Sequence, residues 1–169
     1  LDQMSAYINF DMVGRVADNK LTVQATGTSA MWPKLLEQAN VSAGFDLVLV
    51  ANFGANNIKG FSLSAEGDAT PTVFINDLGG ATGSIWDIHY AEEIDTLFAA
   101  GTTGALLAYA NFSTDMGMSG PSAVILPSNA EGEAVAINLH GVDYDAASDT
   151  VIVTDVGSAD DNTDGHIYA

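Results

Sequence analysis

A loop late in the sequence has the residue types and spacing of a cation site. Asp160, Asn162 and Asp164 alternate with other residues, and Gly165 follows directly. Oxygen-bearing side chains at alternate positions converge on one cation, and glycine permits the tight turn of a calcium loop. The bidentate glutamate that completes such loops has no counterpart in the printed sequence. Two interpretations therefore stay open, a structural calcium site and a solvated hairpin loop.

The histidines and cysteines offer little further chemistry. The three histidines fall at non-equivalent places in the repeats described below, so they form no repeated zinc-ligand set. The chain contains no cysteine, which excludes disulfides, thiolate catalysis and cysteine–zinc sites. Catalytic residues are therefore not assigned.

The net charge of −18 limits the classes of partner. Nucleic-acid binding needs basic patches that neutralise phosphate, and this chain has only four lysines and arginines. No apolar run reaches the length of a membrane helix, so no membrane span is expected. Strong acidity fits a salt-rich or calcium-rich exterior, where cations screen the repulsion. We therefore expect an extracytoplasmic protein, secreted or periplasmic; solubility alone is the other explanation of the charge.

Three stretches of the chain repeat one pattern, in which an aspartate precedes an apolar strand. The stretches are residues 46–52, 95–101 and 149–155. Their first residues are 49 (95 − 46) and 54 (149 − 95) positions apart. Each is followed by a turn and a second apolar segment, at residues 58–61, 106–109 and 166–169. A repeat near 50 residues built of short strands is typical of propeller blades.

Further strands are expected around these repeated stretches. Residues 85–90 and 139–144 precede the aspartates of the second and third repeats by the same distance, and residues 72–75 and 123–126 follow as fourth strands. The order resembles the blades of NHL-like and YVTN-like β-propellers over residues 46–169. We expect a set of aromatic side chains to pack within and between these blades. The set is Trp86, Phe98, Tyr109, Tyr144 and Tyr168.

The first 45 residues follow a different pattern. An alternating apolar strand is expected from Ser5 to Gly14, a polar turn at residues 17–20, and a second strand at residues 21–25. Residues 30–40 place apolar side chains at helical spacing. The sequence thus predicts a mainly β chain, with two to three propeller-like antiparallel blades at residues 46–169, preceded by a small α/β (strand-strand-helix) segment at residues 1–45.

Residues 9–15, Asn-Phe-Asp-Met-Val-Gly-Arg, carry a second resemblance. They are similar to the Asn-x-Asp-Met-x-Gly-Arg element of the M28 family of zinc aminopeptidases, and the order of segments continues that likeness over residues 1–48. The resemblance implies that Asp11 is a zinc ligand. The other ligands of that family have no counterpart in this chain, and one carboxylate does not hold a catalytic zinc.

The two resemblances meet near residues 45–50, so the chain has the pattern of a mosaic. We expect a non-catalytic, acidic, extracytoplasmic β-repeat module for protein interaction or scaffolding. Its partners would be another protein or a second copy, bound through open sheet edges. Calcium would be structural. The alternative is a fragment or relative of an M28-type zinc metallo-aminopeptidase with an incomplete metal site, in which Asp11 is the surviving ligand.

Overall fold

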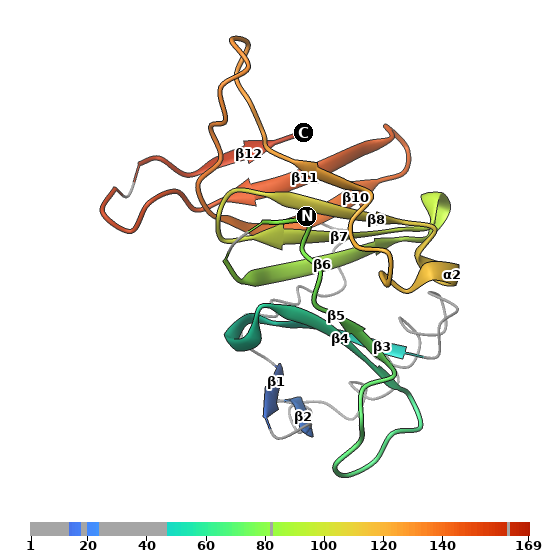
Figure 1. Ribbon diagram of the computed structural model, residues 1–169. Coiled ribbons are helices and arrows are strands. Elements are labelled where there is room, and N and C mark those ends of the chain that lie inside the picture. Colours follow the sequence, from blue (N-terminus) through green and yellow to red (C-terminus); the bar gives the residue numbers. More distant parts are fainter. Residues whose placement is uncertain (1–13, 18–19, 24–46, 82, 162) are drawn as a thin grey trace, which may run out of the picture.

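The computed structural model describes residues 14–17, 20–23, 47–81, 83–161 and 163–169, and these residues are mainly β (Figure 1). The strands are β1 (Gly14–Ala17), β2 (Lys20–Val23), β3 (Leu47–Asn52), β4 (Asn57–Ser62), β5 (Val73–Ile75), β6 (Ile85–Ala91), β7 (Thr96–Gly101), β8 (Leu106–Ala110), β9 (Ala123–Ile125), β10 (Leu139–Asp145), β11 (Thr150–Asp155) and β12 (His166–Tyr168). Short helical turns are η2 (Phe53–Ala55), η3 (Glu92–Ile94) and α2 (Phe112–Asp115). No helix in the described ranges is long and apolar enough to cross a bilayer.

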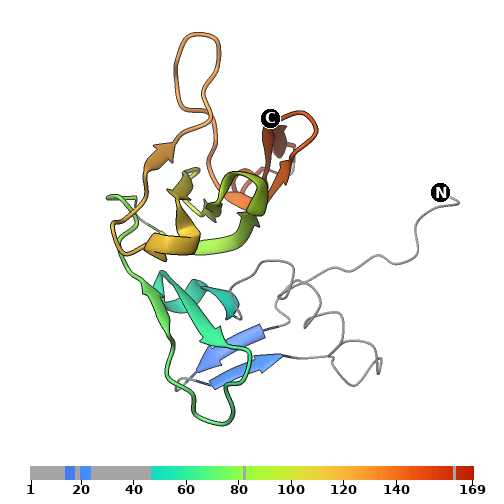
Figure 2. The same ribbon diagram turned by 90° about the vertical axis from the view of Figure 1, so that its right-hand side faces the viewer.

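The strands form antiparallel sheets that stack in layers. Sheet I is β3-β4-β5, sheet II is β6-β7-β8-β9, and sheet III is β10-β11-β12, while β1 and β2 form a separate hairpin. Sheet II lies between the other two (Figure 1). Figure 2 shows the same layers from the side. None of these sheets closes on itself within the described part of the chain.

The register of sheet I matches that of β7, β8 and β9. Ile58 of β4 pairs with Ile75 of β5, as Leu106 of β8 pairs with Ile125 of β9. The hydroxyl-bearing residue directly before β5 makes the same hydrogen bonds as the one directly before β9. The backbone N–H and side-chain hydroxyl of Thr72 both donate to the Gly60 carbonyl, and those of Ser122 both donate to the Ala108 carbonyl. The pairing of β4 with β5 therefore corresponds to that of β8 with β9, and the described part of sheet I has no strand equivalent to β6.

Sheets II and III share one hairpin design. The Tyr90 hydroxyl donates to Asp95 at 2.9 Å, and the Tyr144 hydroxyl donates to Asp149 at 2.6 Å. Both aspartates have positive φ, 47° and 53°, a conformation that aspartate tolerates better than most residues. The repeated aspartate thus ends the tight turn that leads into β7 and β11.

The core consists of two apolar layers, one on each face of sheet II. All six residues of β7 are buried because alternate side chains serve both layers. Leu97 and Ala99 pack towards sheet I, whereas Phe98 and Ala100 pack towards sheet III. Full burial of a leucine side chain contributes about 1.5–3 kcal/mol, so the two layers are the main source of stability.

The expected aromatic packing is found in the described sheets. Phe98 and Tyr109 are buried in the core, and Tyr144 and Tyr168 pack partly buried against the layer between sheets II and III. Trp86 lies at the edge of the stack, where it contacts other rings instead of the aliphatic core.

The front segment differs from expectation at one boundary. The first strand was expected to end at Gly14, but β1 continues to Ala17, which pairs directly with Lys20 of β2. Val16 and Leu21 also pair, so the hairpin extends beyond the glycine. The helix expected at residues 30–40 lies outside the described residues.

Candidate functional site at the junction of sheets II and III

Two β-bulges place aromatic rings at the edge of the stack. The register shifts between Ile85 and Asp87 in β6, and again between Leu139 and Gly141 in β10. The extra residues are Trp86 and His140. A bulge re-aims the side chain of its extra residue, and these two rings contact each other with centroids 4.0 Å apart. Phe53 lies 4.4 Å from Trp86 on the other side, so a row of rings crosses all three sheets.

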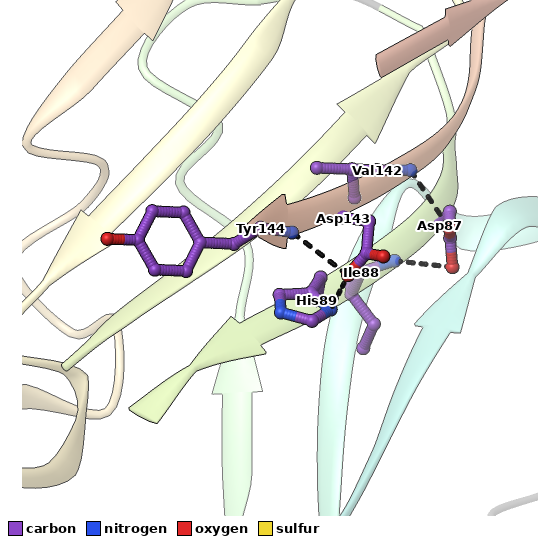
Figure 3. Close-up of polar contacts among 6 residues, drawn as sticks. All are labelled: Asp87, Ile88, His89, Val142, Asp143 and Tyr144. Carbon is purple, nitrogen blue, oxygen red and sulfur yellow. Dashed lines mark hydrogen bonds and ion pairs between the residues drawn. The ribbon is translucent and has the colours of Figure 1, made fainter. Parts of the chain in front are cut away.

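Asp87 joins sheet II to sheet III through its carboxylate. Oδ1 accepts the Ile88 N–H at 2.9 Å and Oδ2 accepts the Val142 N–H at 3.1 Å (Figure 3). The second bond crosses between sheets. Gly141 precedes Val142, and a Cβ there would lie 2.8 Å from the hydroxyl of Thr154. The glycine therefore leaves room for the hydroxyl of Thr154, its cross-strand partner in β11.

Burial raises the pKa of Asp87 above its ordinary value, because the partly buried junction solvates the carboxylate poorly. The two backbone N–H donors and the charge of His89 lower the pKa but do not offset the loss of water. Asp143 adds a smaller upward effect by repulsion. A raised carboxyl pKa is a feature of general acids as well as of structural contacts.

A histidine–aspartate pair lies beside Asp87. His89 Nδ1 is 3.1 Å from Asp143 Oδ1, and the same oxygen accepts the Tyr144 N–H at 2.9 Å (Figure 3). The Asp143 side chain is largely exposed, so the pair contributes at most about 1 kcal/mol and only while the imidazole is protonated. The Asp87–Val142 and His89–Asp143 contacts both join β6 of sheet II to β10 of sheet III.

The predicted calcium loop follows a buried anchor at the end of β11. Asp155 accepts the backbone N–H groups of Ile137, Asn138 and Gly157, at 2.7, 3.0 and 2.8 Å. These bonds attach the chain before β10 to the base of the loop. The loop therefore starts from a rigid point.

Within the loop, the predicted ligands do not share one neighbour. Asp164 Oδ2 accepts the Ser158 N–H at 2.9 Å, and Oδ1 is buried with no hydrogen-bond donor among the described residues. Asp160 is exposed, and Asn162 lies outside the described residues. No group of three or more His, Cys, Asp or Glu side chains in the described ranges is arranged to hold a metal ion. Asp11, the zinc ligand expected by resemblance, also lies outside the described residues.

The outer edge of sheet II is open along β9. This strand pairs with β8 on one side, and its three side chains are exposed. Val124 and Ile125 are followed by exposed Leu126, so the edge is aliphatic. An unpaired edge with apolar side chains is a template for another strand.

Sequence reasoning did not identify the junction of Asp87, Trp86 and His140. A signal existed, because Trp86 and His140 both stand nine positions before a repeated aspartate (95 − 86 and 149 − 140). A charged residue inside the apolar stretch of residues 85–88 was a second signal. Neither signal reveals which backbone donor the carboxylate meets.

Comparison with known proteins gave no match to any family model, to curated proteins or to solved structures.

Proposed function

We propose that this chain is a non-catalytic, acidic, extracytoplasmic β-repeat module that acts in protein interaction or scaffolding. The observation that carries the proposal is the open aliphatic edge of β9, in a sheet whose strand β7 is fully buried. An extended peptide that adds to such an edge gains main-chain hydrogen bonds, and the alternate side chains give specificity.

The layered repeat supports a propeller-like reading of sheets I to III. Equivalent positions in β3–β5 and β7–β9 have the same pairing and the same serine or threonine contacts. Each sheet contacts the next through an apolar face, as stacked repeats do. The net charge of −18 supports a location where salt screens the surface.

A structural calcium ion at Asp160, Asn162 and Asp164 forms part of the proposal. The buried Oδ1 of Asp164 supports it, because a buried carboxylate oxygen without a hydrogen-bond donor is costly unless a cation neutralises it. Such an ion would hold the loop against Gly157 and Ser158 and would take no part in a reaction.

The decisive experiment is a selection of extended peptides against the immobilised chain, followed by mapping of amide shifts by NMR. Peptides that bind are expected to perturb the amides of β9 and β8, and Val124→Lys is expected to abolish binding because a lysine blocks edge pairing. Ile137→Lys, which adds the same charge at another exposed aliphatic residue, is the matched control. Failure to select any peptide, or shifts confined to another surface, contradicts the proposal.

A further inference from the structure

The free edge of β9 lacks the features that normally protect a sheet edge from pairing. Natural edges are protected by lysines, prolines or bulges within the strand. The residues of β9, Ala123–Ile125, include no lysine and no proline, and they pair with β8 in regular register. Pro121 and Pro127 stand outside the strand on either side. Among the described residues no strand pairs with the other side of β9, so the edge is open to an extended segment.

Carboxylates lie where the chain enters this edge. Asp115 accepts the N–H and the hydroxyl of Ser119 at 3.0 and 2.7 Å. These two bonds lower the pKa of Asp115, so its carboxylate is ionised near neutral pH. Asp77 is exposed, and its carboxylate lies against the same turn, because a Cβ at Gly120 would be 2.6 Å from Asp77 Oδ2. Two negative charges therefore precede β9.

Two further carboxylates lie beyond the other end of β9. Residues 127–135 form a hairpin that projects from the sheets (Figure 1). At its tip, Asn129 Oδ1 accepts the N–H groups of Glu131 and Glu133 at 3.1 and 2.9 Å. The Asn129 amide also donates to Glu133 Oε2 at 3.1 Å. The tip is thus held in one conformation, and it presents two exposed glutamates.

No basic side chain of this part of the chain neutralises these groups. Residues 60–169 contain no lysine or arginine, but they contain 17 aspartates and glutamates (22 in the chain less five before residue 60). The last cation in the sequence, Lys59, lies over the ring of Phe74 in sheet I. An acidic segment, or the same edge of a second copy, would meet like charge here. A basic segment would meet opposite charge at both ends of the edge.

We propose that the edge of β9 binds an extended cationic segment of another protein, in which apolar residues alternate with lysine or arginine. The main chain of that segment pairs with β9, and its apolar side chains lie beside Val124 or Ile125, on one face of the sheet or the other. Its basic side chains reach the carboxylates before β9 and those at the hairpin tip. This inference rests on the proposed interaction function and gives the chemical class of the partner.

The test uses the full chain and three peptides of equal length, in which valine alternates with lysine, glutamine or glutamate. Fluorescence anisotropy measures Kd, and amide shifts in NMR spectra show where each peptide binds. At low salt the lysine peptide is expected to bind at β9 at least about tenfold more tightly than the glutamine peptide, because several exposed ion pairs add together. Salt at about 0.5 M is expected to remove most of this difference, and the glutamate peptide is expected to bind most weakly.

Charge-neutralising variants locate the attraction. Glu131→Gln combined with Glu133→Gln is expected to weaken the lysine peptide several-fold and to leave the glutamine peptide unchanged, since glutamine at 133 still accepts the Asn129 amide. Glu66→Gln removes an exposed carboxylate between β4 and β5 and is the matched control for Glu131→Gln. It is expected to change neither Kd, and circular dichroism checks that every variant is folded.

The inference and the proposed function fail in different ways. A glutamine peptide that binds at β9 as tightly as the lysine peptide overturns the inference and leaves the function standing. Equal weakening by Glu66→Gln and Glu131→Gln also overturns the inference, because it shows attraction by the total charge alone. A dimer in sedimentation equilibrium that Val124→Lys dissociates assigns the edge to a second copy instead. If no peptide of any charge binds at β9, the function fails and the inference fails with it.

Discussion

Leu106 and Ile167 occupy equivalent positions of the repeat, because they pair with Ala100 and Thr154, each five residues after a repeated aspartate (100 − 95 and 154 − 149). This equivalence gives a prediction about stability. Leu106→Ala removes a side chain that is packed between sheets II and III, whereas Ile167→Ala removes one at the same repeat position that is mainly in solvent. The two substitutions are close in chemistry and differ in burial. Any difference between them therefore measures what the contact between sheets contributes.

The magnitudes follow from burial. A fully buried leucine replaced by alanine costs about 2–5 kcal/mol, through lost transfer free energy and the cavity left behind. An exposed substitution lies within about 0.5 kcal/mol of zero. For a chain of 169 residues, each kcal/mol lowers Tm by roughly 2–4 °C. We expect Leu106→Ala to lower Tm by about 4–20 °C and Ile167→Ala by less than about 2 °C.

The assay is thermal and urea unfolding followed by circular dichroism at low protein concentration, where association does not contribute. Equal effects of the two variants would refute the reasoning, because they would show that sheet III does not cover Leu106. A Leu106→Ala effect as small as that expected for Ile167→Ala would refute it in the same way.

Three other results are expected. The pKa of Asp87 is raised in the folded state, so the contribution of this side chain to stability increases as pH falls through that pKa towards the ordinary value of 3.8. Acidification should therefore shift the difference in unfolding free energy between wild type and Asp87→Asn in favour of wild type. Desolvation raises the pKa of Asp95, but hydrogen bonds from the N–H and hydroxyl of Ser113 and the hydroxyl of Tyr90 outweigh it and lower the pKa overall. Ser113→Ala should therefore destabilise the fold by at most about 1 kcal/mol near neutral pH. A pH series of urea unfolding curves should show this effect disappear below pH 3.8, where the Asp95 carboxylate becomes protonated. Calcium should raise the Tm of wild type in differential scanning calorimetry and leave Asp164→Asn unchanged, while magnesium at equal concentration serves as the control for screening.

Strand positions were readable from the sequence because the repeats carry apolar residues between turn residues. The segment at 95–101 becomes β7, and its aspartate ends the turn in both sheet II and sheet III. The order of strands in sheet II also follows from the chain, because consecutive segments joined by short turns pair as hairpins.

The junction at Asp87 could not be read in this way. A bulge shifts the alternation by one residue, so the faces of Trp86 and His140 are set by backbone geometry that no sequence period reports. The raised pKa of Asp87 depends on its burial where sheet III packs on sheet II, and no sequence period encodes that packing. The expected roles of Asp11 and Asn162 stay predictions, since both lie outside the described residues.

The position of sheet II has a consequence for how the molecule opens. Sheets I and III meet sheet II on opposite faces, and their apolar layers contain no members in common. In such a linear array each unit is stabilised by its nearest neighbours, so the end units can fray while the centre persists. Opening of sheet II, by contrast, removes both layers at once. Amide exchange should therefore be slowest in β7, and its protection should report the global unfolding free energy while β5 and β12 exchange through local opening.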